Sequence, residues 1–197
     1  MFTGIVQSVG EVRLITPRGG DVEMLIGAPR LDLATVAIGD SISCSGCCLT
    51  VTRIEGEAFA ADVSIETLNV TTLGQWRAGQ RLNLEKALYA GQPLGGHYVT
   101  GHVDGVATVV DRVNDARSIR VQFEAPAALA RYIARKGSVC LDGVSLTVNE
   151  VDAARFAVNL IPHTLEVTTL DEYRAGTRLN LEVDIIARYL ERLNAAS

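Results

Sequence analysis

The sequence predicts an all-β protein: two tandem six-stranded Greek-key β-barrels related by internal duplication, followed by a C-terminal helix. Three observations lead to this prediction. A long segment recurs at a constant offset, and short stretches alternate apolar and polar residues between Gly, Asp and Asn. The long crossover helices of a parallel α/β sheet are absent from the pattern. The expected boundaries are 1–96 for the N-terminal barrel, 97–184 for the C-terminal barrel and 185–197 for the helix.

The duplication is clearest between TLNVTTLGQWRAGQRLNLE at 67–85 and TLEVTTLDEYRAGTRLNLE at 164–182. The offset is 97 residues, and 14 of the 19 positions are identical, where about one match is expected by chance at ordinary composition. The same offset aligns GCCLTV with GVSLTV, and TGIVQSVGEV with TGHVDGVATV. The connector YAGQPLGG, rich in glycine, separates the two copies and marks a domain boundary.

Each copy predicts five to six short strands and one short helix. The strands expected in the first copy are TGIVQSVGEVRLI, DVEMLIGA, DSISCSG, CLTVTRIEG, AFAADVSI and RLNLEKAL. The helical candidates are APRLDLATVAIGD at 28–40 and APAALARYIARKG at 125–137. In each, proline lies near a plausible first turn and glycine lies past the end.

The final segment predicts an amphipathic helix. Its apolar residues fall on one stripe at helical spacing: Ile185, Ile186, Tyr189, Leu190 and Leu193. Such a stripe must be buried against its own barrel or against a partner, and self-association is the favoured interpretation.

Composition narrows the class of protein. The chain has 197 residues, 48% of them hydrophobic, and a net charge of −5, which argues against a nucleic-acid surface. No apolar run approaches the roughly 20 residues that span a bilayer, and no secretory signal opens the sequence. We therefore expect a cytoplasmic protein with a small-molecule partner and no nucleic-acid or membrane partner.

The cysteines and histidines do not predict a metal site. Three of the four cysteines crowd into residues 44–48, and reduced thiols are expected. The C-x-x-C formed there has no second pair of ligands. His97 and His102 lie near Asp104, but His102 occupies the repeat position of Ile5 and His97 belongs to the connector.

Strand alternation separates a core face from a polar face in each copy. In the first copy Leu49 and Val51 share one face, whereas Cys48 and Thr50 share the other. GVSLTV repeats the pattern, with Ser145 in place of Cys48. A second polar run, DVSIETL at 62–68, matches NLIPHTL at 159–165. Such segments suit a planar heterocycle, although a threonine-rich exposed strand edge would have the same pattern.

Several motifs together resemble the riboflavin synthase family over essentially the whole length. They are MFTGIV, GHYVTGHVDG, GCCLTV, LDGVSLTVNEV and LNLEVDIIARYLER. One departure is Ser45-Gly46-Cys47, where the family commonly shows Asn-Gly followed by an aliphatic residue. The Cys48 position remains intact.

The resemblance implies lumazine-binding barrels and a dismutation that is the last step of riboflavin biosynthesis. Two 6,7-dimethyl-8-ribityllumazine molecules would exchange a four-carbon unit, giving riboflavin and 5-amino-6-(D-ribitylamino)uracil. It further implies no cofactor or metal and a homotrimer. The active sites would lie between the N-terminal barrel of one subunit and the C-terminal barrel of another. Lumazine synthase is a further expected partner.

The resemblance also implies the site residues, and their copy of the repeat predicts the barrel to which each belongs. For the first barrel they are Gly4, Ile5, Val6, Cys48, Leu49, Thr50, Asp62, Val63, Ser64, Ile65, Glu66 and Thr67. For the second they are Gly101, His102, Val103, Lys136, Ser145, Leu146, Thr147, Ile161, Pro162, His163, Thr164, Leu165 and Glu166.

Five positions are candidate catalytic residues. His102 is the candidate for proton transfer near the C7 methyl group, with a structural histidine as the alternative. Cys48 is either a nucleophile or a positioning contact, and the Lys or Arg nearest to it in sequence is Arg53. Ser145 and Thr147 are expected to orient water or a hydroxyl at C7, and Asp184 to orient such a group across the subunit interface.

Two other functions are alternatives to the dismutation. A non-catalytic lumazine or flavin antenna protein shares the expected fold, but would be expected to lose reactive positions in one copy. A flavin oxidoreductase barrel would need a nucleotide-binding βαβ unit with a glycine-rich loop, and the chain has none. The retention of Cys48, His102, Lys136 and Ser145 favours catalysis.

Overall fold

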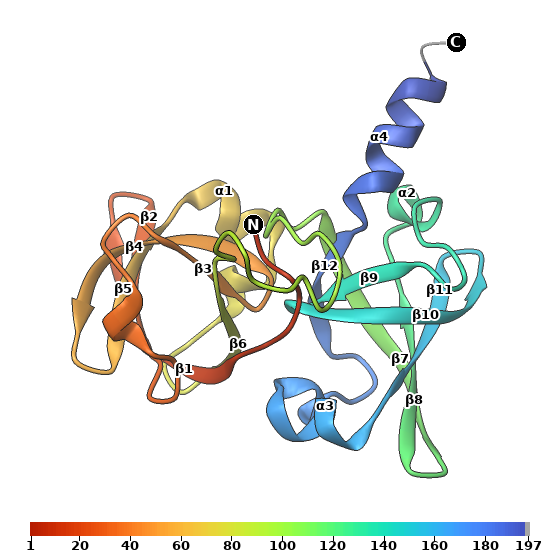
Figure 1. The fold of residues 1–197 in the computed structure, drawn as a ribbon, viewed down its shortest axis with the longest axis horizontal. Coiled ribbons are helices and arrows are strands. Elements are labelled where there is room, and N and C mark those ends of the chain that lie inside the picture. Colours follow the sequence, from red (N-terminus) through yellow and green to blue (C-terminus); the bar gives the residue numbers. More distant parts are fainter. Residues whose placement is uncertain (196–197) are drawn as a thin grey trace.

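The computed structural model describes residues 1–195 and contains two closed antiparallel barrels of six strands each. The barrels stand side by side, and the C-terminal helix projects from the second (Figure 1). The predicted fold class is thus confirmed. Residues 196 and 197, at the end of the expected helical segment, lie outside the described residues.

The two barrels have the same strand order. In the N-terminal barrel β2 pairs with β5 and β3 closes onto β6, giving the order β1-β2-β5-β4-β3-β6, the non-consecutive pairing of a Greek key. The second barrel repeats it with β7 to β12. The first set is β1 (Ser8–Arg18), β2 (Asp21–Gly27), β3 (Ser41–Cys44), β4 (Cys47–Glu55), β5 (Ala58–Val63) and β6 (Arg81–Lys86). The second is β7 (Gly105–Asp115), β8 (Ser118–Glu124), β9 (Ser138–Leu141), β10 (Val144–Asp152), β11 (Arg155–Leu160) and β12 (Arg178–Val183).

Each barrel encloses its own apolar core, as the alternating pattern predicts. Leu49 and Val51 are buried in the first core, and Leu146 and Val148 in the second. Thr50 and Thr147 lie exposed on the opposite face, with Cys48 and Ser145 half-buried. The predicted division of β4 and β10 into a core face and a polar face is therefore correct.

The helices inside the barrels differ from the prediction. The candidate at 28–40 forms only a 3-10 turn, Leu33–Thr35, which the Asp32 side chain caps, and the candidate at 125–137 forms one turn, α2 (Ala127–Ala130). Each barrel instead has a six-residue helix in the second polar run: α1 (Ile65–Val70) and α3 (Pro162–Val167). Ser64 caps α1, and proline occupies the first turn of α3, where its missing N–H costs nothing.

The C-terminal helix α4 (Ile185–Asn194) presents its polar side to its own barrel. Tyr132 donates to Glu191, and Arg188 pairs with Asp104 and stacks over the Tyr132 ring. The opposite stripe is exposed, with Ile186, Tyr189, Leu190 and Leu193 each at least half accessible. Its own barrel does not cover this stripe. Among residues 1–195, no helix is both long and apolar enough to cross a membrane.

Two equivalent asparagines join the barrels. The side chain of Asn180 donates to the Ser45 carbonyl of the other barrel and accepts from the Thr72 N–H, both at 2.8 Å. Asn83 makes the same two bonds in the reverse direction, to the Asp142 carbonyl and the Thr169 N–H, again at 2.8 Å. Because these hydrogen bonds are reciprocal, the two barrels are related by an approximate twofold axis.

Gly46 and Gly143 lie on this axis and contact each other. A Cβ added to either glycine would approach the backbone nitrogen of the other to 2.8 Å. The close approach of the two barrels explains why both copies have glycine here, because both positions need a residue without a side chain.

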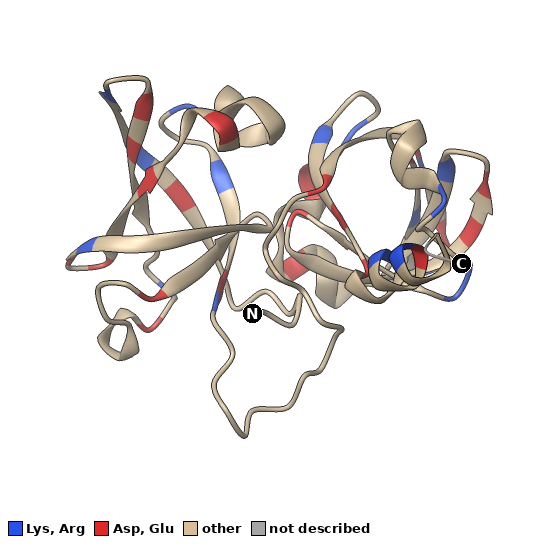
Figure 2. Ribbon diagram, turned by 90° about the horizontal axis from the view of Figure 1, so that it is seen from above, with Lys and Arg blue, Asp and Glu red and all other residues tan. Residues whose placement is uncertain are grey.

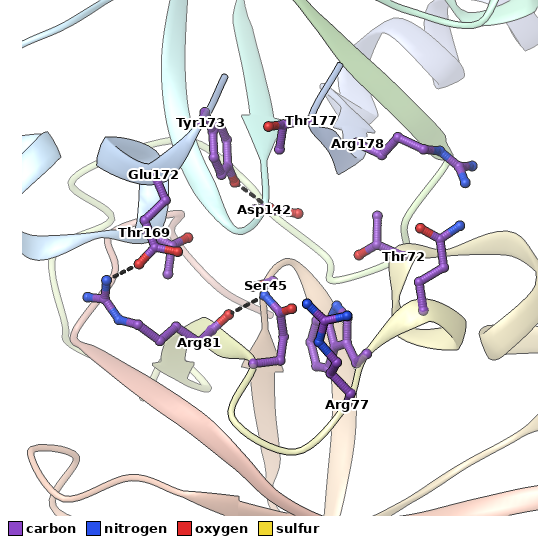
Figure 3. Close-up of a pocket in the computed structure, with 13 residues that line it drawn as sticks. Ser45, Thr72, Arg77, Arg81, Asp142, Thr169, Glu172, Tyr173, Thr177 and Arg178 are labelled. Carbon is purple, nitrogen blue, oxygen red and sulfur yellow. Dashed lines mark hydrogen bonds and ion pairs between the residues drawn. The ribbon is translucent and has the colours of Figure 1, made fainter. Parts of the chain in front are cut away.

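A polar cavity of about 310 Å³ lies between the barrels beside this axis (Figure 3). None of the site residues expected from the sequence lines it. Asp142 lines this cavity and accepts hydrogen bonds from the Tyr173 hydroxyl and, at 2.7 Å, from the Asn180 N–H. Burial outweighs these bonds and raises the pKa of Asp142 to about 7. The equivalent residue of the first copy, Ser45, accepts the matching bond from the Asn83 N–H without a charge.

We predict that replacing Asp142 with asparagine flattens the dependence of stability on pH. The folded-state pKa of Asp142 is about 7, whereas an unfolded aspartate titrates near about 3.9. Its stabilising contribution is therefore complete below about pH 4 and is lost as pH rises from there through 7, a change on the order of a few kcal/mol. An asparagine side chain at this position would mimic the protonated carboxyl without titrating. Denaturant unfolding at pH 5 and pH 8 checks this, and equal losses in wild type and Asp142→Asn would contradict it.

Candidate functional site

Two buried glutamates fix the segments that precede the two barrels. Glu85 accepts the N–H and hydroxyl of Thr3 at 2.7 and 2.6 Å and the N–H of Gly4 at 3.0 Å. Glu182 does the same for Thr100 and Gly101, with distances from 2.6 to 2.9 Å. Burial raises the pKa of both carboxyls, and the donated bonds oppose that shift. These bonds attach each segment to the last strand of a barrel, β6 for Glu85 and β12 for Glu182.

Each fixed segment contacts the opposite barrel. The Gly4 carbonyl accepts from the Ser145 N–H at 2.8 Å, and the Gly101 carbonyl accepts from the Cys48 N–H at 2.9 Å. Val6 packs on the C-terminal core and Val103 on the N-terminal core, so these two residues also contact the opposite barrel. The two segments therefore cross between barrels.

The crossing corrects the grouping of site residues expected from the sequence. The repeat groups Gly4, Ile5 and Val6 with Cys48, but they lie beside Ser145. It groups Gly101, His102 and Val103 with Ser145, but they lie beside Cys48. The reason is that a repeat offset identifies equivalent residues and not which copy they contact.

The structure thus forms two candidate edges. We call the N-terminal edge residues 48–50, 62–67 and 101–103, and the C-terminal edge residues 4–6, 145–147 and 161–166. The strand register supports each grouping, since Val51 pairs with Ala61 and Val148 with Val158. The following members are exposed on the single chain: Ile5, Thr50, Asp62, Ser64, Ile65, Glu66, His102, Thr147, Ile161, Pro162, His163 and Glu166. The partly buried members are Val6, Cys48, Thr67, Val103, Ser145, Thr164 and Leu165, and the buried ones are Gly4, Leu49, Val63, Gly101 and Leu146.

His97 is the residue that sequence reasoning missed. Its ring is buried, and Nδ1 lies 2.7 Å from Ser145 Oγ. The sequence placed His97 in the connector, outside both copies, so the repeat carried no signal for it. Asp184 lies close enough for its charge to act on the same ring, and its side chain caps α4 by accepting from the Ile186 N–H at 3.0 Å.

Comparison with known proteins agrees with this duplicated arrangement. The lumazine binding domain family matches residues 3–87 and again residues 100–184. The chain is 45% identical to a riboflavin synthase of Photobacterium phosphoreum, covering 98% of this chain and 88% of that one. It is 47% identical to a riboflavin synthase of Mycobacterium bovis and 44% identical to one of Brucella abortus, each covering 98% of both chains.

The chain belongs to the riboflavin synthase family. Its fold is also similar to LumP in complex with riboflavin, with a TM-score of 0.85 and 30% identity over 93% of this chain and 99% of that one. LumP in complex with 6,7-dimethyl-8-(1'-D-ribityl) lumazine superposes with a TM-score of 0.83 at 28% identity, with the same coverage. The lumazine-binding domain occurs twice here, once for each barrel.

The four cysteines differ in accessibility, and all are free thiols, as predicted. Cys44 and Cys47 belong to the N-terminal core, and burial raises the pKa of both, that of Cys47 to about 12. Cys140 packs with Phe2 and Val99 between the barrels, where burial also raises its pKa. These three thiols fill space, and Cys48 alone reaches a candidate edge.

Lys136 is held in a conformation that a lysine rarely adopts. Its φ is +67°, and its N–H donates to the Val148 carbonyl at 2.7 Å. In this riboflavin synthase family member, the equivalent residue of the first copy is Gly39, with φ +97° and the matching bond to Val51 at 2.8 Å. Glycine would adopt this conformation at less cost. Backbone strain of this kind is often found at binding sites.

We predict that Lys136→Gly raises stability and weakens ligand binding. Relief of the positive φ should increase the free energy of unfolding by about 0.5–1 kcal/mol, less the extra entropy of glycine in the unfolded chain. Loss of the ammonium group should raise the Kd for 6,7-dimethyl-8-ribityllumazine. Denaturant unfolding and fluorescence titration measure the two effects. Ala153→Gly, at another turn with φ +51°, is the matched control and should gain stability with unchanged affinity. An unaltered Kd for Lys136→Gly would contradict the binding role.

Proposed function

We propose that this protein is a riboflavin synthase, a transferase. It converts two molecules of 6,7-dimethyl-8-ribityllumazine into riboflavin and 5-amino-6-(D-ribitylamino)uracil by moving a four-carbon unit from one to the other. The observation that carries the proposal is the pair of lumazine-binding barrels, in a chain 44–47% identical to curated riboflavin synthases over nearly its whole length.

The two edges suit a reaction in which identical molecules take unequal parts. The N-terminal edge carries Cys48 and His102, whereas the C-terminal edge carries Ser145 and Ile5 in the equivalent places. A duplicated barrel supplies two similar binding sites, and these differences would make one ring the donor and the other the acceptor. Holding the two rings together would lower the barrier by replacing a bimolecular encounter.

We assign the chemical roles according to the corrected grouping. His102 serves proton transfer at the C7 methyl group of the lumazine held by the N-terminal edge, where Cys48 contacts the ring. Ser145 and Thr147 orient the group added at C7 of the lumazine on the C-terminal edge, and Asp184 assists them from the start of α4. Leu49 and Leu146 support these residues from the core side of the same strands.

A homotrimer would complete the sites. Thr50, His102 and Thr147 are exposed on the single chain, so each edge needs a cover, and a second copy can bring the C-terminal edge of one subunit over the N-terminal edge of another. Acidic and basic residues are interspersed over both barrels (Figure 2), which suits a small-molecule enzyme of the cytoplasm. Lumazine synthase, as the source of the substrate, is the proposed further partner.

The alternative is a non-catalytic lumazine- or flavin-binding antenna protein of the same fold. The similarity of the fold to LumP in complex with lumazine and with riboflavin favours this interpretation. The identity to LumP is 28–30%, well below the identity to the riboflavin synthases. The enzyme is therefore the better-supported function.

We predict that the purified protein forms riboflavin from 6,7-dimethyl-8-ribityllumazine alone. Flavin absorbance and the release of 5-amino-6-(D-ribitylamino)uracil should rise in equal amounts, because each turnover consumes two lumazines. His102→Gln should lower kcat by about 10²-fold if it transfers a proton. If the protein binds lumazine and quenches its fluorescence but forms no riboflavin, the enzyme hypothesis is rejected and the antenna protein is favoured.

We predict that charges on the exposed stripe of α4 dissociate the oligomer. Leu190→Glu combined with Leu193→Glu should give monomers at micromolar concentration, because an ionised side chain is costly to bury in an apolar contact. Arg192→Ala, on the same helix and outside the stripe, is the control and should keep the mass of a trimer. Light scattering after gel filtration measures the mass. A trimer that persists with both glutamates would show that α4 does not form the contact.

A further inference from the structure

His97 is held between the two barrels without belonging to either repeat. Its backbone N–H donates to the Thr3 carbonyl at 3.2 Å, and Thr3 is itself fixed by Glu85. The ring is only 8% exposed, and Nδ1 lies 2.7 Å from Ser145 Oγ. The imidazole therefore contacts the Ser145 hydroxyl of the C-terminal edge.

The surroundings favour a neutral ring. Burial lowers the pKa of His97, and the negative charge of Asp184 opposes this only in part. A neutral imidazole has one donor nitrogen and one acceptor nitrogen, whereas an imidazolium can only donate. Within residues 1–195, His97 Nε2 is buried without a hydrogen-bond partner.

The N-terminal edge has no such pair. Its Cys48 occupies the position of Ser145, and no imidazole is hydrogen-bonded to that thiol within the described part of the chain. The His102 N–H donates to the Thr100 hydroxyl at 3.3 Å, and its side chain is exposed. The duplication therefore gave both edges a polar strand residue, and the connector added a histidine to one of them.

We propose that His97 is a positioning residue for Ser145. The ring carries its proton on Nε2 and accepts the Ser145 hydroxyl proton in a hydrogen bond at Nδ1. The lone pairs of Ser145 Oγ then face the ligand, so the C-terminal edge presents an acceptor to the donor groups of its lumazine. This inference rests on the proposed function, since it takes that edge to hold a lumazine.

Protonation of His97 would reverse the bond. The imidazolium donates from Nδ1 to Ser145 Oγ, so the hydroxyl proton turns toward the ligand and the edge becomes a donor. The charged groups around the ring are Asp184, at the start of α4, and Glu85, one hydrogen bond beyond Thr3. Because burial lowers the pKa of His97, the acceptor state is kept at neutral pH and is lost on acidification.

Two variants of His97 separate the hydrogen bond from the titration. His97→Asn places an amide near the position of Nδ1, so it can bond to Ser145 but cannot titrate. His97→Leu can do neither. At pH 7 we expect His97→Asn to keep kcat within about threefold of wild type and His97→Leu to lose about tenfold, the cost of roughly one hydrogen bond. The acid decline of kcat that is due to His97 should be absent from the asparagine variant.

A double-mutant cycle tests whether His97 acts through Ser145. In the Ser145→Ala background, His97→Leu should have no further effect on kcat. Thermal unfolding of each variant shows whether it remains folded. An equal loss with and without the Ser145 hydroxyl, or an unchanged acid decline in His97→Asn, would overturn the proposal.

NMR supplies a measurement that does not depend on turnover. The chain has three histidines, so single variants assign their ring signals, and ¹⁵N shifts report the tautomer. We expect His97 to be protonated on Nε2 and to titrate below the ordinary histidine value of about 6.5. Its ¹⁵N signals should shift in Ser145→Ala. A ring protonated on Nδ1 overturns the proposal.

If the protein forms no riboflavin, the proposed function fails. The cycle is then measured on the Kd for dimethylribityllumazine, where additive effects would reject the coupling.

Discussion

Two buried carboxyl groups fix the two segments that complete the candidate edges. Glu85 and Glu182 each accept three hydrogen bonds from a Thr-Gly pair at the start of a copy. Buried carboxyls are tolerated where their oxygens are fully bonded. With the pair fixed in this way, the carbonyls of Gly4 and Gly101 accept hydrogen bonds from the opposite barrel. Both edges therefore consist of residues from both copies.

The same twofold arrangement explains why the barrels form one unit. Asn83 and Asn180 exchange hydrogen bonds across the axis with backbone groups that would otherwise be buried without partners. A displacement of one barrel would break these bonds and pull each crossing segment from the edge it completes. The interface that stabilises the pair of barrels is thus also what keeps the edges assembled.

The barrels could be predicted from the sequence because the repeat is exact in spacing and its strands alternate with period two. Leu49, Val51, Cys48 and Thr50 took their expected faces for that reason. The partner of each crossing segment could not be predicted, since similarity between Gly4 and Gly101 does not say which barrel each contacts. His97 was missed because it lies outside the repeat, and α1 and α3 because six-residue helices leave almost no periodic signal.

The contact between Phe2 and Val99 bears on how the two barrels came to share one chain. These two residues are equivalent in the repeat, and each donates its N–H to the other's carbonyl, at 2.7 and 3.2 Å. A surface on which a residue meets its own counterpart is isologous, the kind of contact that joins two identical chains. A single ancestral barrel with this surface could have paired with a second copy of itself, each lending its leading segment to the other. Joining the genes would then have made that exchange permanent and freed the two halves to diverge.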